Sequence, residues 1–269
     1  MVDNASSDGS AAGVQDLPLP LELIRNPSNI GFAAACNQAA AGSTADYLLF
    51  LNPDTRLFPD TLAEVTRFMD SERASRIGIC GVQIVGGDGR PGISCARFPT
   101  LRVLLGKITG LDRLLPRVFP SHHLSPAETM QSRLVDQVIG AFFFVRSDLF
   151  ARLGGFDARY FIYFEEVDFA LRARRLGALT YFLKEATAVH AGNVSSNQVL
   201  ALRLYHSLRS RRLYASEHWV RWQAVVLVGV TLSVELVGRL TSAAVRRSAS
   251  ELRATGAGYG RFVGDLLRP

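Results

Sequence analysis

The feature that most constrains the fold is an alternation of short, continuously apolar runs with segments that carry helix signals. The apolar runs are bounded by turn residues and lie at 21–24, 47–51, 77–85, 138–146 and 179–183. Helix start and stop signals, such as Pro59-Asp60 before a helix at 61–70, fall between these runs. Strands without an exposed face, interleaved with helices, are typical of an α/β layer. We therefore predict an α/β fold with a mainly parallel sheet flanked by helices.

The charge of the chain changes sharply near residue 202. Residues 203–269 hold 11 arginines, no lysine and four acids, for a net charge of +7, whereas residues 1–202 carry −1. A basic, apolar tail indicates contact with a membrane surface or a nucleic acid. We expect one domain at 1–202 and a basic amphipathic helical region at 203–269.

The tail has the periodicity of an amphipathic helix. Placed on a helical wheel, residues 217–253 bring most charges into one stripe: Glu217, Arg221, Glu235, Arg239, Arg246 and Arg253. The uncharged run 224–234 has only eleven residues, against the roughly 20 needed to span a bilayer. We predict a surface-lying helix, or a broken pair, on an anionic membrane; the alternative is a helix packed on the domain with a solvated charged face. No nucleic acid is expected, because few aromatic residues interleave with the arginines.

Four motifs occur in a fixed order: "VDNASSDGS" (2–10), "NPDTRL" (52–57), "GGFDARYFIYFEEVDFALRARRLG" (154–177) and "VHAG" (189–192). Together they resemble family 2 glycosyltransferases of the GT-A fold, and in particular bacterial rhamnosyltransferases that act on lipid-linked sugars. The resemblance implies an inverting hexosyl transfer that uses Mg²⁺ or Mn²⁺. It also implies a nucleoside diphosphate sugar donor such as dTDP-L-rhamnose, a polyprenyl-diphosphate-linked acceptor, and a cytoplasmic place at the inner face of the cell membrane.

A buried strand ends abruptly at Asn52-Pro53-Asp54. A carboxylate at such an end can bind a divalent ion that prefers oxygen ligands. The family usually has Asp-x-Asp here, so the resemblance makes Asp54 the metal carboxylate and leaves Asn52 as a neutral group beside the nucleotide sugar. It also makes His190 a metal ligand. The alternatives are a turn role for Asp54 and a structural histidine.

The residues expected to contact the nucleotide sugar lie near the start of the chain. The resemblance assigns Asp3 to the base or ribose, and Asn29, Gly31 and Asn37 at a helix start to the neighbourhood of the nucleotide. Backbone N–H groups at a helix start can also face an anion. An Asx turn at Asp3 and helix capping by Asn29 remain the structural alternatives.

Three carboxylates, Glu165, Glu166 and Asp168, follow the aromatic run 160–164. Sugar transfer to a hydroxyl needs a base, and an apolar wall beside neighbouring acids raises a carboxylate pKa. In the family the second acid of a pair is the base, which corresponds to Glu166 here, with Glu165 as the alternative. Asp168 is four residues before Arg172 and is either structural or an acceptor contact; Asp157 either contacts the acceptor or caps a turn. The competing interpretation is a helix start with acids favoured by its dipole.

The family has a strand and a crossover helix before the first motif, and this chain begins at that motif. We therefore expect the first strand and helix of the family fold to be absent from this sequence. The alternative function is a truncated, non-catalytic homologue that binds a sugar nucleotide or docks at a membrane.

Overall fold

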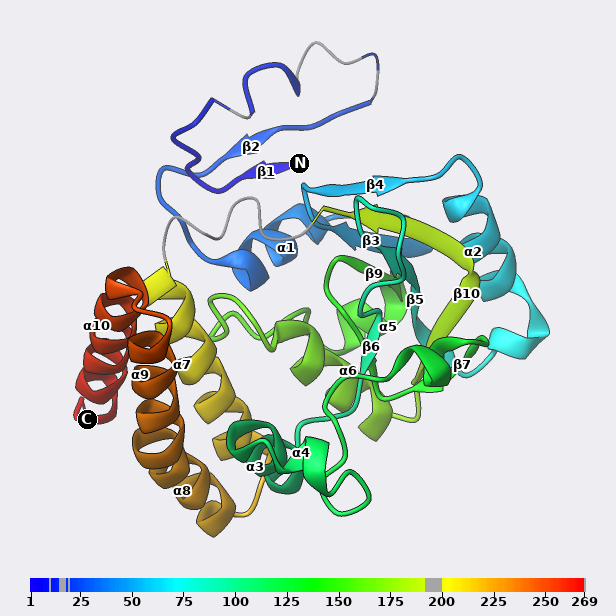
Figure 1. Cartoon of the computed structure of the whole chain (residues 1–269). Coiled ribbons are helices and arrows are strands. Elements are labelled where there is room, and N and C mark those ends of the chain that lie inside the picture. The colour runs from blue at the N-terminus through cyan, green and yellow to red at the C-terminus, as the bar shows by residue number, and fades with distance from the viewer. Residues whose placement is uncertain (10, 15–17, 19, 192–199, 269) are drawn as a thin grey trace.

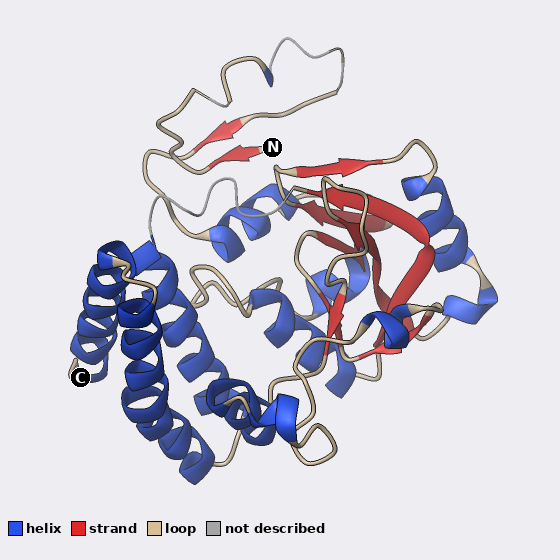
Figure 2. Cartoon of the chain, in the orientation of Figure 1, coloured by secondary structure: helices blue, strands red, loops and turns tan. Residues whose placement is uncertain are grey.

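The computed structural model describes residues 1–9, 11–14, 18, 20–191 and 200–268. A six-stranded sheet occupies one side of the molecule, and a group of long helices formed by the C-terminal quarter stands beside it (Figures 1 and 2). A separate two-stranded sheet from the start of the chain lies above the first helix (Figure 1). Ser10 and Gly192, the last residues of two motifs, lie outside the described residues.

The strands are β1 (Val2–Asp3), β2 (Ile24–Arg25), β3 (Tyr47–Leu51), β4 (Thr55–Leu57), β5 (Ile77–Val85), β6 (Cys95–Ala96), β7 (Arg133–Val135), β8 (Gln137–Val138), β9 (Phe142–Arg146) and β10 (Leu179–His190). The α-helices are α1 (Phe32–Ala40), α2 (Thr61–Asp70), α3 (Leu101–Thr109), α4 (Leu111–Leu114), α5 (Ser147–Arg152), α6 (Glu165–Arg175), α7 (Leu200–His218), α8 (Arg221–Val230), α9 (Leu236–Val245) and α10 (Ala249–Leu266). Short 3₁₀ turns lie at Glu72–Ala74 and Pro126–Thr129, and a π-helical turn lies at Thr231–Glu235.

The large sheet has the strand order β3-β9-β5-β10-β4, and β7 also pairs with β10. β5 and β10 run parallel, whereas β9 is antiparallel to both of its neighbours and β4 and β7 are antiparallel to β10. The α/β class predicted from the sequence is confirmed. The pairing within the sheet is mixed, with the parallel pair β5–β10 at its centre.

Both faces of the sheet are covered, which explains the continuously apolar strands. Along β9, Phe143 and Val145 belong to one buried cluster together with residues of α1, α5 and α6, while Phe142 and Phe144 belong to a second cluster together with residues of α2. Successive side chains of a strand point to opposite faces. The run "FFFV" therefore contributes side chains to the core on both faces of the sheet, between β3 and β5.

The apolar run 138–146, predicted as one strand, is divided in the structure. β8 ends at Val138 and pairs with β6, and β9 begins at Phe142 in the large sheet. Between them the Ile139 N–H bonds to the Ser94 carbonyl, and the Ala141 carbonyl accepts from Asn52. An isolated glycine, Gly140, lies at this break, as is common where a strand is interrupted.

The helix expected to start near Tyr160 starts at Glu165. Tyr163 and Phe164 both have the left-handed conformation, with φ of 69° and 73°, which no α-helix can include. Their loop is held from two sides, because the Phe161 carbonyl accepts from Phe32 of α1 and the Ile162 carbonyl accepts from Ser210 of α7. The aromatic run is therefore a packed loop that leads into the acids.

The four C-terminal helices pack onto the domain through α7. Tyr214 of α7 joins Tyr160 and Val167 in one buried cluster, and Leu208 joins Tyr259 and Phe262 of α10 in another. The boundary predicted at residue 202 falls at the first turn of α7. Residues 203–269 thus contribute core side chains to the rest of the chain.

Glu235 is the buried member of the tail's charged stripe, whereas Arg221, Arg239 and Arg253 of the stripe are exposed. Glu235 is buried and pairs with Arg211 of α7 at 2.5 Å and with Arg239 at 3.0 Å, and Glu217 pairs with Arg159 at 2.8 Å. α8, the π turn and α9 form one run, Arg221–Val245, of 25 residues with a mean hydropathy of 1.7. By length and composition this run is long enough to cross a membrane. The apolar helix was therefore wrongly expected to end after eleven residues at Glu235, because Glu235 pairs with Arg211 of α7 and the helix continues beyond it.

Candidate active site

The β4–β10 pairing brings Asp54 and His190 together at one edge of the sheet. His190 lies opposite Thr55 in the antiparallel register, and the Ala191 N–H donates to the Asp54 carbonyl. Asp54 Oδ1 lies 3.1 Å from His190 Nε2, and the Asn52 amide nitrogen lies 3.4 Å from the same ring atom. The side chains of Asp54 and His190 are 19% and 23% exposed. Residues 138 positions apart thus share one small, accessible polar site.

The donor atoms at this site fit a divalent cation held jointly with a substrate. One carboxylate and one imidazole converge, and among the described residues no cluster of three or more His, Cys, Asp and Glu occurs. Mg²⁺ and Mn²⁺ are commonly bound by one or two carboxylates, with phosphate oxygens and water completing the shell. A cation here would therefore depend on the phosphates of a bound nucleotide for much of its coordination.

Of the two glutamates that begin α6, Glu165 is buried and Glu166 is half-buried, and neither has an ion-pair partner among the described residues. The Oε2 atom of each has no hydrogen-bond partner in the described part of the chain. Burial and the charge of Glu166 raise the pKa of Glu165 well above the ordinary glutamate value. Burial also raises the pKa of Glu166, although backbone N–H groups at the helix start oppose this. Such unpaired, desolvated carboxylates are characteristic of proton-transfer groups.

Gly140 links the glutamates to the Asp54–His190 edge, and the sequence analysis did not single it out. A Cβ placed on Gly140 would lie 3.8 Å from the Glu166 carboxyl carbon. The next carbonyl, that of Ala141, accepts hydrogen bonds from Asn52 N–H and from the Thr55 hydroxyl. The signal was present as an isolated glycine inside an apolar run, which often marks a close approach of another group.

The predicted nucleotide residues form a polar network around the β1–β2 sheet. Asp3 accepts from the Ser6 N–H at 2.9 Å, which lowers its pKa, and this is the Asx-type turn named as an alternative. The Asn29 side chain accepts from Asn4 and from the Gly31 N–H. These contacts stabilise the turns. Contact of Asp3 and Asn29 with a nucleotide stays a prediction.

Gly31 and Asn37 connect α1 to the loops before α6. Gly31 has a φ of 91°, and a Cβ there would lie 2.7 Å from the Phe161 carbonyl oxygen, so only glycine fits. Asn37 donates to the Phe156 carbonyl and accepts from the Phe156 N–H. Both residues thus fix the segment that leads to the glutamates, and direct contact with a nucleotide remains a prediction for them.

Asp157 and Asp168, predicted as acceptor contacts, have their carboxylates engaged within the chain. The Asp157 carboxylate pairs with Arg159 at 2.6 Å. Burial raises the pKa of Asp157, but the hydrogen bonds from Arg159 outweigh this and lower it. Asp168 is buried and binds Arg172 and His218, each at 2.7 Å. We assign Asp168 the structural role named as its alternative, because the His218 contact ties α6 to α7.

The raised pKa of Glu165 predicts that its ionised side chain lowers the stability of the folded protein. We expect Glu165→Gln to raise the thermal unfolding midpoint at pH 8, because the amide removes a buried negative charge without changing shape. A glutamate whose pKa is higher in the folded than in the unfolded protein destabilises the fold when it is ionised. This destabilisation disappears as the pH falls toward the pKa of the unfolded chain, near 4.3. The gain should be of the order of ~2–4 °C, or about 1 kcal/mol in a chain of this size, and shrink at pH 4.5. Equal gains at both pH values in differential scanning calorimetry would contradict a charge effect.

Comparison with known proteins places the chain among sugar-transferring enzymes. Residues 1–119 match the family described as glycosyl transferase family 2. An N-acetylglucosaminyl-diphospho-decaprenol L-rhamnosyltransferase of Mycobacterium tuberculosis is 28% identical over 240 residues, covering 82% of this chain and 75% of that protein. The rhamnosyltransferase WbbL of Escherichia coli is 29% identical over 147 residues, covering 54% of this chain and 52% of that protein.

Solved structures agree with the fold. A mannosyltransferase from Pyrobaculum calidifontis, in complex with GDP-mannose and Mn²⁺, superposes with a TM-score of 0.54 at 16% identity, covering 98% of this chain and 77% of that one. TarS of S. aureus (residues 1–349) superposes with a TM-score of 0.51 at 16% identity, covering 97% and 69%. At these identities the likeness concerns the fold alone.

Proposed function

Because residues 1–119 match glycosyl transferase family 2 and the chain is similar to rhamnosyltransferases, we propose that it is a family 2 glycosyltransferase that transfers a hexosyl group with inversion and with a divalent metal. The proposed donor is dTDP-L-rhamnose. The proposed acceptor is a polyprenyl-diphosphate-linked sugar, the class for which the mycobacterial relative is named.

The observation that carries this proposal is the separation of two kinds of polar group at one sheet edge. Asp54 and His190 are partly exposed and close to each other, whereas Glu165 and Glu166, the latter beside Gly140, each have a buried carboxylate oxygen without a hydrogen-bond partner among the described residues. A metal-held diphosphate needs the first environment, and a general base needs the second. This division supports transfer better than simple binding of a sugar nucleotide.

The chemistry follows from these positions. An acceptor hydroxyl attacks the anomeric carbon on the face opposite the diphosphate, and Glu166 takes the hydroxyl proton as the new glycosidic bond forms. The bond from the anomeric carbon to the diphosphate breaks, and the nucleoside diphosphate leaves with that electron pair. A cation at Asp54 and His190 would neutralise the leaving charge. Burial favours the base, since it raises the pKa of Glu166 toward the working pH.

A non-catalytic homologue that only binds a sugar nucleotide is the second candidate function. The Asx turn at Asp3 and the engaged carboxylates of Asp157 and Asp168 favour it, because they leave fewer free groups for the substrates. The discriminating experiment incubates the purified chain with dTDP-L-rhamnose, an N-acetylglucosaminyl diphospholipid and Mn²⁺, and measures released dTDP and glycolipid product. Donor binding without either product would support the second candidate and overturn the first.

We further propose that the chain lies on the inner face of the cell membrane through α8 and α9. Their outward side chains are large and apolar: Trp222, Val225, Val237 and Val245 are 59%, 70%, 61% and 78% exposed. Glu235 of the same run pairs with Arg211 of α7 and with Arg239 one turn further on. A helix that is polar toward its own domain and apolar outward suits the membrane interface, with surrounding arginines toward anionic headgroups.

A double substitution on the apolar face tests this placement. We expect Val225→Glu/Val237→Glu to abolish flotation with anionic liposomes, because two acids replace exposed apolar side chains and repel the headgroups. Circular dichroism should show an unchanged fold, since both positions are exposed. The matched control is Leu134→Glu on β7, which is 52% exposed and lies on the opposite side of the molecule (Figure 1). Equal flotation of the double variant and the parent would exclude this face.

A further inference from the structure

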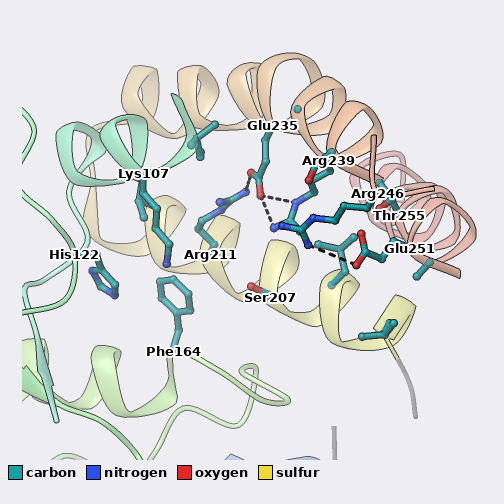
Figure 3. Close-up of a pocket in the computed structure, with 17 residues that line it drawn as sticks. Lys107, His122, Phe164, Ser207, Arg211, Glu235, Arg239, Arg246, Glu251 and Thr255 are labelled. Carbon is teal, nitrogen blue, oxygen red and sulfur yellow. Dashed lines mark hydrogen bonds and ion pairs between the residues drawn. The ribbon is translucent and has the colours of Figure 1, made fainter. Parts of the chain in front are cut away.

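A large polar cavity lies between α3, α7, α9 and α10, outside the Asp54–His190 edge. Its volume is about 670 Å³, which is within the ~300–1,000 Å³ typical of small-ligand sites. Figure 3 shows basic side chains reaching into it from separate helices. They are Lys107 of α3, Arg211 of α7, and Arg239 and Arg246 near the end of α9.

The charges of this cavity do not balance. Glu235 pairs with both Arg211 and Arg239, and Glu251 lies 3.7 Å from Arg246. Four cations therefore face two carboxylates, which leaves a surplus of two positive charges. Within the described part of the chain, the Lys107 ammonium makes no ion pair or hydrogen bond. Desolvation and the positive charge of Arg211 lower the pKa of Lys107, while Glu235 and Asp112 oppose this shift in part.

The cavity also lies between the two functional regions. Phe164 lines it, and the next residue is Glu165. On the other side, α9 supplies Gly238 and Arg239 to the lining while Val237 is exposed on its outer surface. The cavity thus borders both α9 and Phe164, the residue that precedes the glutamates of α6.

We propose that this cavity binds the diphosphate of a lipid-linked substrate, with Lys107 as a direct phosphate ligand. A diphosphate that joins a lipid to a sugar carries one negative charge on each phosphate, which matches the surplus of two. The lipid chain leaves along the apolar face of α8 and α9, and the sugar extends past Phe164 toward Glu166. This inference rests on the proposed transfer to a lipid-linked acceptor, because it names the site where that acceptor is held.

Kinetics with two acceptors test the inference. One is an N-acetylglucosaminyl diphosphate on a farnesyl chain, and the other is an alkyl N-acetylglucosaminide without phosphate. We expect Lys107→Gln to raise KM for the diphosphate acceptor about tenfold or more, as for the loss of a charge-assisted hydrogen bond. KM for the sugar nucleotide and all constants with the alkyl acceptor should not change. Lys107→Arg should restore the parent KM, and Lys184→Gln, at the only other lysine, should match the parent.

Binding without chemistry separates failure of the inference from failure of the proposed function. In equilibrium dialysis with EDTA, farnesyl diphosphate should bind the parent about tenfold more tightly than Lys107→Gln, and farnesyl phosphate should show a smaller difference. If the parent transfers sugar but Lys107→Gln equals it with the diphosphate acceptor, the inference is overturned and the proposed function stands. If transfer is absent but the Lys107 dependence of farnesyl diphosphate binding remains, the site stands and the proposed function fails. A Lys107 dependence seen only with phosphatidylglycerol vesicles would show a general headgroup site and overturn the inference.

Discussion

Glu166→Gln should lower the turnover of sugar transfer by about 10²–10⁴-fold while leaving affinity for the nucleotide sugar nearly unchanged. The amide keeps the size of the side chain but cannot accept the hydroxyl proton. A base acts in the transition state, so its loss appears in kcat and not in donor binding. The unpaired, buried position of Glu166 beside Gly140 is the reason to place the effect here.

Glu165→Gln is the matched control, because Glu165 is the adjacent carboxylate and its Oε2 atom, like that of Glu166, is buried without a hydrogen-bond partner among the described residues. It should retain turnover within about tenfold of the parent, although the loss of one charge changes the acid limb of the pH profile of Glu166. Donor affinity is measured by calorimetry on both variants. Turnover of Glu166→Gln within tenfold of the parent, or a larger loss in Glu165→Gln, would move the base to Glu165.

Removal of divalent metal should abolish transfer, and Asp54→Ala should do the same at ordinary metal concentration. Asp54 supplies a carboxylate at the sheet edge, and the His190 imidazole lies 3.1 Å from it. With so few protein ligands, we expect the metal to bind tightly only when the nucleotide diphosphate is present. The measurement is Mn²⁺ binding by electron paramagnetic resonance, with and without dTDP, beside activity in EDTA.

Asp88→Ala is the control for Asp54→Ala, because Asp88 lies in an exposed turn near Arg90. It should leave both Mn²⁺ binding and transfer unchanged. Excess Mn²⁺ should partly restore Asp54→Ala, since phosphate oxygens and His190 remain. Full activity of the parent in excess EDTA would show that transfer needs no divalent metal. Asp54 and His190 would then have only the structural role of a hydrogen-bonded pair in a turn.

The sequence predicts strands and helices of this fold well where a segment has a single, uniform hydrophobic pattern. The bounds of β3, α2 and β5 agree with the expected ranges, because each is a run of uniform character between clear turn signals. The edge formed by Asp54 and His190 was expected only from a family resemblance. Periodicity cannot bring together two residues so far apart in the sequence, and the β4–β10 pairing does so here.

The remaining features were missed because tertiary contacts overrule local preference. Aromatic residues before Glu165 look helical, yet hydrogen bonds from α1 and α7 hold Tyr163 and Phe164 in left-handed conformations. The helical wheel of the tail gathers most charges into one stripe, of which Glu235 is buried while Arg221 and Arg239 are exposed. A wheel cannot know that Arg211, on another helix, will pair with Glu235.

The helix α7 has a consequence for how substrate and fold depend on each other. Its 19 residues extend over about 28 Å, and its side chains bind the Ile162 carbonyl, Asp168 and Glu235. The loop before the glutamates and the wall of the polar cavity are therefore attached to one rigid element. A ligand that favours the folded form of that cavity adds to the unfolding free energy of the whole assembly, in proportion to the logarithm of its concentration above its dissociation constant. If the proposed lipid-linked substrate binds this cavity, a lipid surface that supplies it would therefore also stabilise the fold, and the loop before the glutamates would be held less firmly in its absence.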